Sequence, residues 1–154
     1  MPSSDARKET LSLEKAATHL LEECRMVLPG IQALLGFQLV AVFSTTFRDT
    51  LSHSEQLAHL IAMLCVVLAV ALVMAPAAVH RVREPASVSQ AFLTLSSRLL
   101  MLGMLPVAAA TSVDVYLIAR VISHSTPVAL TAGMLCVVIF LSAWLIVPWR
   151  ARLP

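Results

Sequence analysis

One carboxylate, Asp114, stands inside a long apolar run, in the stretch TSVDVY at residues 111–116. An ionisable group inside a membrane costs at least about 2.5 to 3.5 kcal/mol on insertion scales, so it normally faces protein or water and often marks an ion or proton path. Counted inward along neighbouring apolar runs, His59, Thr45 and Thr131 come to a similar depth. Because a carboxylate beside an imidazole can exchange protons near neutral pH, these four residues form a candidate ion or proton site.

A structural interpretation of Asp114 stays open beside the first one. The carboxylate can cap a kink, pair with Arg48 or Arg120, or form a hydrogen bond across an oligomer interface. Gln38 can also be interpreted as either structural or functional, because this polar residue stands near the middle of the first apolar run. Hydrogen bonding between helices explains an uncharged glutamine there, and the alternative is a pore-lining role.

A second polar cluster is expected at the opposite ends of the same apolar runs. Opposite charges at a membrane interface usually form salt bridges, which here would fix an N-terminal helix to a loop; alternatively, the arginines bind anionic lipid head groups. The cluster consists of Glu23, Arg25, His80, Arg81 and Arg98.

Other chemistry finds little support in the sequence. No phosphate-binding glycine loop, nucleophile elbow or paired-acid motif is present, and the chain has only four glycines with which to build one. His53, Glu55, His59 and His124 lack a tight ligand spacing such as H-E-x-x-H. The three cysteines are widely spaced and contain no C-x-x-C. We therefore expect no enzyme, no cofactor and no metal site.

The composition indicates which elements position these residues. Hydrophobic residues make up 58% of the chain and charged residues 13%, against about 25% charged in a typical soluble domain. Four apolar runs, at roughly 29–47, 56–79, 99–118 and 127–147, reach the length of about 20 residues that crosses a bilayer. The sequence predicts an all-α integral membrane protein in which residues 29–149 form one four-helix bundle. A net charge of +2 without an aromatic-basic patch does not indicate nucleic acid.

The segment before the first span has a different pattern. Residues 12–28 repeat apolar side chains at intervals of three and four, which is typical of an amphipathic helix lying along the interface, with Ser12 as its N-cap. At Leu28-Pro29-Gly30 we expect an elbow where this helix turns into the membrane. Pro76 and Pro106 are expected to kink the second and third spans. Residues 1–11 are predicted to be a disordered tail, and 150–154 a cytoplasmic tail.

The distribution of Lys and Arg predicts the orientation. Nine of the eleven lie before the first span, between the second and third, or after the fourth, and only Arg48 and Arg120 lie in the other two loops. Since cytoplasmic loops carry an excess of Lys and Arg, both termini are expected in the cytoplasm.

Two segments resemble an uncharacterised bacterial family of small four-helix membrane proteins. The segments are EECRMVLPGIQALLGFQL and APAAVHR, followed by Arg98. The family carries an E-x-R-x-x-L-P-G-x-Q signature, matched here by Glu23, Arg25, Leu28, Pro29, Gly30 and Gln32. The resemblance implies a multi-pass protein of the bacterial plasma membrane. It implies little about activity, although some members are labelled sodium/proton antiporters.

The leading functional hypothesis is an oligomeric channel or transporter for protons or small cations that uses Asp114. Four helices leave little room for a hydrated path, so a conducting form is expected to be a homo-oligomer, and the small-residue pairs Ala108/Ser112 and Ala129/Gly133 allow close helix approach. The competing hypothesis is a membrane scaffold or accessory subunit that transports nothing. The expected partners are the lipid bilayer, further copies of the chain and anionic lipid.

Overall fold

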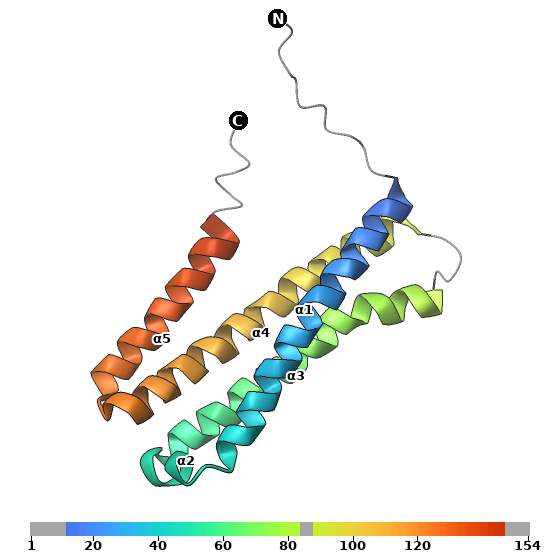
Figure 1. The fold of residues 1–154 in the computed structure, drawn as a ribbon. Coiled ribbons are helices and arrows are strands. Elements are labelled where there is room, and N and C mark those ends of the chain that lie inside the picture. The colour runs from blue at the N-terminus through green and yellow to red at the C-terminus, as the bar shows by residue number, and fades with distance from the viewer. Residues whose placement is uncertain (1–11, 84–87, 147–154) are drawn as a thin grey trace, which may run out of the picture.

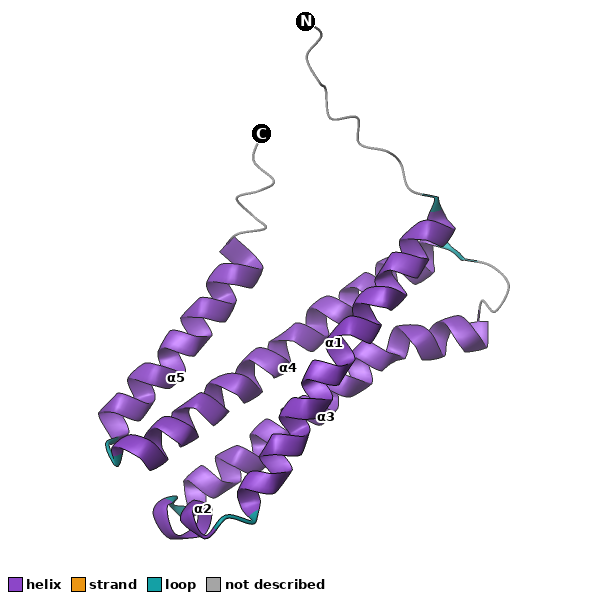
Figure 2. Cartoon of the chain, in the orientation of Figure 1, coloured by secondary structure: helices purple, strands orange, loops and turns teal. Residues whose placement is uncertain are grey.

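The computed structural model describes residues 12–83 and 88–146, except for the side chains of Arg83 and Leu145. The described residues form five α-helices and a short π-helix, with no strand among them (Figures 1 and 2). The tails predicted at 1–11 and 150–154 lie outside the described residues. The elements are α1 Leu13–Val42, α2 Thr45–Thr50, α3 His53–Arg83, α4 Gln90–Ser123, α5 Thr126–Leu141 and η1 Ser142–Ile146.

Four helices are long and apolar enough to cross a membrane: Leu13–Val42, His53–Val82, Gln90–Ser123 and Thr126–Trp144. The helices alternate in direction, so α1 begins and α5 ends at the same end of the molecule (Figure 1). We call this end the termini side; it also holds the end of α3 and the start of α4. The opposite end, with α2 and the α4–α5 turn, is called the loop side.

The predicted elbow at Leu28-Pro29-Gly30 is wrong, because α1 continues through Pro29 as one helix of 30 residues. Its buried side chains recur at helical spacing on both sides of the proline, so one face stays against the other helices along its length. They are Ala17, Leu20, Cys24, Ile31 and Gln38. Pro29 itself is exposed, and there is no separate helix over 12–28. The expected N-cap is confirmed: the Ser12 side chain accepts a hydrogen bond from the Lys15 backbone N–H.

The first predicted span extends too far toward its C-terminus. Helix α1 ends at Val42, and residues Thr45–Thr50 form the separate short helix α2, so the run to Phe47 is not one helix. The second and third predicted spans lie within α3 and α4. The fourth is α5 continued by the π-helix η1 as far as Ile146.

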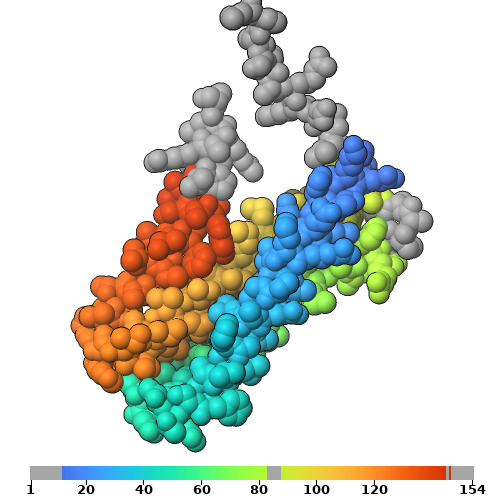
Figure 3. Space-filling view, in the orientation of Figure 1, coloured from blue at the N-terminus to red at the C-terminus, as the bar shows by residue number. Residues whose placement is uncertain are grey.

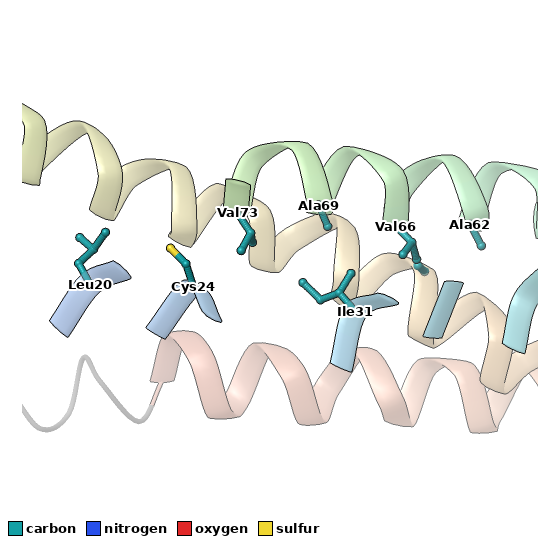
Figure 4. Packing of buried hydrophobic residues seen from close by; sticks show 8 residues of the cluster. Leu20, Cys24, Ile31, Ala62, Val66, Ala69 and Val73 are labelled. Carbon is teal, nitrogen blue, oxygen red and sulfur yellow. The ribbon is translucent and has the colours of Figure 1, made fainter. Parts of the chain in front are cut away.

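Small apolar residues form the core between α1, α3 and α4. Ala62, Val66, Ala69 and Val73 project from one side of α3, and Leu20, Cys24 and Ile31 meet them from α1 (Figure 4). Gly103 lets α4 approach closely: a Cβ atom at that position would lie 3.3 Å from Val73 Cγ2. Helix α3 makes its most extensive contact with α4.

Helix α5 packs mainly on α4, and α4 is visible between α1 and α5 on one face of the molecule (Figure 3). Ala129 and Gly133 are buried in this contact, where a Cβ atom on Gly133 would lie 3.1 Å from Tyr116 Cβ. The small-residue pair on α5 therefore packs within the chain and leaves little of itself for contact with another copy.

Candidate functional site

Three predicted polar residues from three helices meet on the loop side. Gln38 of α1 donates a hydrogen bond from Nε2 to Asp114 Oδ2 of α4, with a distance of 2.7 Å. His59 of α3 places its Nδ1 atom 3.5 Å from Asp114 Oδ1. Gln38 and His59 are buried, and the Asp114 side chain is 13% exposed. We call Gln38, His59 and Asp114 the polar triad.

The backbone of α1 determines which nitrogen of His59 carries a proton. His59 Nε2 lies 3.0 Å from the Gln38 carbonyl oxygen, which can only accept a hydrogen bond. Nε2 must therefore hold a hydrogen, and in the neutral ring Nδ1 then presents a lone pair toward Asp114. Asp114 Oδ1 has no hydrogen-bond donor among the described residues. When the ring is neutral, two acceptor atoms therefore face each other, and one additional proton on either of them would satisfy both.

A pocket of about 430 Å³ gives access to the triad between α1, α2 and α4. Most of its wall is apolar, formed by side chains such as Phe37, Phe47 and Leu117. The ring of Phe47 contacts that of His59 edge-on at 5.0 Å. Gln38 Oε1, a buried oxygen of a lining residue, has no hydrogen-bond partner in the described part of the chain. The pocket can hold water or a small cation beside the carboxylate.

Another group of polar residues, centred on Glu55, lies one helical turn from the triad along α3. Glu55 Oε1 accepts a hydrogen bond from the Tyr116 hydroxyl at 2.9 Å and lies 3.2 Å from Arg120 Nε. Its other oxygen, Oε2, accepts hydrogen bonds from the backbone N–H and the hydroxyl of Ser52. We call these residues the outer cluster. Arg120 is therefore paired with Glu55, and the proposed pairing of Asp114 with Arg120 is not found.

Two of the predicted site residues do not join the triad. Thr45 is the exposed first residue of α2, because α1 ends before it, and the pocket is lined instead by Ser44 and Thr46. Thr131 is exposed on α5, where its hydroxyl donates to the Val128 carbonyl oxygen at 2.8 Å. The prediction used depth along the helix, and depth does not determine which way a side chain points.

The sequence analysis missed the outer cluster. Tyr116 and Arg120 are four residues apart and so share a face of α4, which is a detectable signal. Tyr116 was read only as part of the apolar surroundings of Asp114. Glu55 and His59 share a face of α3 for the same reason. Pairing these two faces across antiparallel helices would have predicted both clusters together.

The termini-side residues are only partly brought together. Arg25, His80 and Arg81 line one pocket between α1 and α3, whereas Glu23 and Arg98 lie outside it. The expected salt bridges are not formed, because none of the three arginines pairs with a carboxylate among the described residues. On the same side, His19 Nδ1 lies 3.7 Å from Glu22 Oε2, both on the exposed surface of α1.

No group of three metal-ligating side chains occurs in residues 12–83 and 88–146. His124, one of the histidines considered for such a site, instead ends α4. Its backbone is left-handed, with φ 51°, and its N–H bonds to the Arg120 carbonyl oxygen. Histidine is among the residues that adopt this conformation more readily than most.

The four long apolar helices, with polar clusters near their ends, are characteristic of a multi-pass membrane protein. The chain belongs to a family that is described as Family of unknown function (DUF6328) and that matches residues 7–148. No curated protein and no solved structure matches the chain.

Proposed function

We propose that the protein binds a proton at the polar triad as a step in moving protons or small cations across the bacterial plasma membrane. The observation that carries this proposal is the approach of His59 Nδ1 to Asp114 Oδ1, which are 3.5 Å apart beside a pocket. Asp114 Oδ1 is buried and has no hydrogen-bond partner among the described residues. Such a pair takes up one proton without any change of backbone, and releases it when the pocket fills with water or a cation.

A homo-oligomer is part of the proposal because of what lies beyond the triad. Toward the termini side, the space between α1 and α3 is filled by the apolar core of Ile31, Ala62, Val66 and Ala69. A proton leaving the triad in that direction meets no polar side chain of this core. The second half of the path is therefore assigned to a surface between copies of the chain.

The orientation in this proposal places both termini in the cytoplasm, with the triad pocket opening to the other side. It rests on the excess of Lys and Arg in the termini-side segments. The triad would then exchange protons with the outer solution. Glu55 and Arg120 would lie at the entrance, where their charges influence which ions approach.

A second function, that of a membrane scaffold or accessory subunit, is supported by a different observation. Each member of the triad comes from a different helix, so its contacts connect α1, α3 and α4 at one level. Hydrogen bonds between membrane helices contribute about 0.6 kcal/mol each on average, and up to about 1.7 kcal/mol. In this function Asp114 stabilises the bundle and no ion crosses it.

One experiment separates the two functions. Purified protein is placed in liposomes, and proton and cation flux driven by a pH gradient is measured for the wild type and for Asp114→Asn, with oligomer size determined for both. Asp49→Asn is the matched control, because Asp49 is an exposed carboxylate on α2. We expect flux in the wild type and in Asp49→Asn, and its loss in a normally assembled Asp114→Asn. No flux in the wild type, together with dissociation of Asp114→Asn, would contradict transport and favour the scaffold.

A further inference from the structure

A second pocket lies between α1 and α3 on the termini side, far from the triad. It has a volume of about 370 Å³ and combines basic and apolar side chains. Its walls bring together two segments that the sequence analysis singled out, the run around Arg25 and the run APAAVHR. The residues that line it include Arg25, His80, Arg81, Leu28, Val73 and Met74.

Pro76 explains why α1 and α3 separate here. A proline inside a helix removes one backbone hydrogen bond and bends the axis. Pro76 is fully buried within α3. The last turns of α3 lead away from α1 (Figure 1). The core is closed up to Val73, and the pocket opens in the wedge that follows.

The polar side chains that line this pocket are basic. No carboxylate of residues 12–83 and 88–146 lines it. Within the described part of the chain, Arg25 and Arg81 form no ion pair, and the buried Nδ1 atom of His80 has no hydrogen-bond partner. The His80 ring is held against Phe92 of α4, with centroids 5.4 Å apart. Two guanidinium groups are therefore left to bind an anion.

The depth of the pocket matches the level of lipid phosphates. Glu55 and Arg81 are about 39 Å apart along α3 at 1.5 Å per residue. A bilayer with its head groups is about 40 to 45 Å thick. With Glu55 at one surface, Arg25, His80 and Arg81 come to the head-group layer of the other, and the apolar residues Leu28, Val73 and Met74 face its acyl region.

We propose that this pocket binds the phosphate of an anionic phospholipid. Arg25 and Arg81 contact the phosphate oxygens, for which the planar guanidinium group is well suited. The lipid's acyl chains lie against Leu28, Val73 and Met74. Arg98, on the exposed surface of α4, is outside this site. The proposal does not depend on transport, because the pocket shares no residue with the triad pocket.

The test measures thermal stabilisation of the purified full chain by added lipid. Phosphatidylglycerol is compared with phosphatidylcholine and with inorganic phosphate at equal phosphate concentration. The variant Arg25→Gln/Arg81→Gln removes the two charges, and Arg48→Gln/Arg98→Gln is the control with the same net charge. A lysine variant, Arg25→Lys/Arg81→Lys, keeps the charges and tests whether the guanidinium shape matters. The stability of each variant in phosphatidylglycerol is compared with the stability of the same variant in phosphatidylcholine. A general loss of stability therefore does not affect the measured lipid preference.

We expect phosphatidylglycerol to stabilise the wild type and the control, and phosphatidylcholine and inorganic phosphate to have little effect. A basic residue near an anionic surface contributes about fivefold in binding, so removing both arginines should weaken the apparent affinity about 30-fold. The lysine variant should fall between the wild type and the glutamine variant. Equal weakening in the Arg48/Arg98 control would overturn the proposal, as would equal stabilisation by inorganic phosphate or no preference for phosphatidylglycerol.

Discussion

The contact between α4 and α5 leads to a prediction in which one type of substitution has opposite effects at two glycines. Gly133→Ala would place a Cβ atom 3.1 Å from Tyr116 Cβ and 3.3 Å from the Ser112 backbone oxygen. Neither atom is the end of a flexible side chain, so α5 itself must move. At Gly36 of α1 nothing lies within 4 Å of the added atom, which makes Gly36→Ala a matched control.

The expected changes in the free energy of unfolding come from two contributions. Replacing glycine by alanine in a helix interior stabilises it by about 1 kcal/mol, and this term is common to both variants. Overpacking at a close contact costs about 1 to 3 kcal/mol, and it applies only at Gly133. With a mid-range overpacking cost, Gly36→Ala should raise the free energy of unfolding by about 1 kcal/mol, and Gly133→Ala should lower it by about 1 kcal/mol.

The assay is unfolding by SDS in mixed micelles, with the midpoint compared between the variants. Cys136, half-buried on α5, gives a local measurement in the same samples, because its thiol should react faster with a maleimide when α5 moves from α4. Helix α5 packs mainly on α4, so other helices compensate little for the displacement. If Gly133→Ala is as stable as Gly36→Ala, and Cys136 reacts at the wild-type rate, the close contact deduced from the structure is refuted.

Two further predictions concern hydroxyl groups and use the same unfolding measurement. Tyr116→Phe removes the 2.9 Å hydrogen bond to Glu55 but leaves the contacts of Glu55 with Arg120 and Ser52 in place. The free energy of unfolding should therefore fall by about 1 kcal/mol. An unchanged unfolding midpoint would contradict this prediction. Ser96→Ala removes a hydroxyl that is 0% exposed and has no hydrogen-bond partner in the described residues, so it should raise that free energy by about 1 kcal/mol; a lower midpoint would show that the hydroxyl is bonded after all.

The length and apolarity of the runs predicted the helical architecture, because a helix that crosses a bilayer needs about 20 apolar residues whatever its neighbours are. The same reasoning predicted a break at the start of the first span, which the continuous helix α1 does not have. Proline was taken as a boundary at residue 29, but the buried stripe from Ala17 to Gln38 crosses it without a change of face. Packing along the whole of α1 outweighs the local preference of one exposed proline.

The sequence could predict which residues of the candidate site lie at the same depth in the bundle. Depth along antiparallel helices can be counted from the sequence, and it placed His59 near Asp114, as the structure has them. Direction around the helix axis cannot be counted when a helix is apolar on all sides, which is the case for α5. For that reason Thr131, at a matching depth, points away from the triad.

The two polar clusters on the loop side fix the same register between α3 and α4. The other contacts between α3 and α4 involve apolar residues such as Ala69 and Gly103. Lipid provides no hydrophobic force to hold two membrane helices in register, so polar contacts have greater influence on it. The contact of His59 with Asp114 and the pairing of Glu55 with Arg120 would both be lost by such sliding. A proton bound or released at the triad, as proposed, would therefore act on a contact that also influences helix position. The two proposed functions, transport and scaffolding, would use the same residues, and the flux of a normally assembled Asp114→Asn protein distinguishes them.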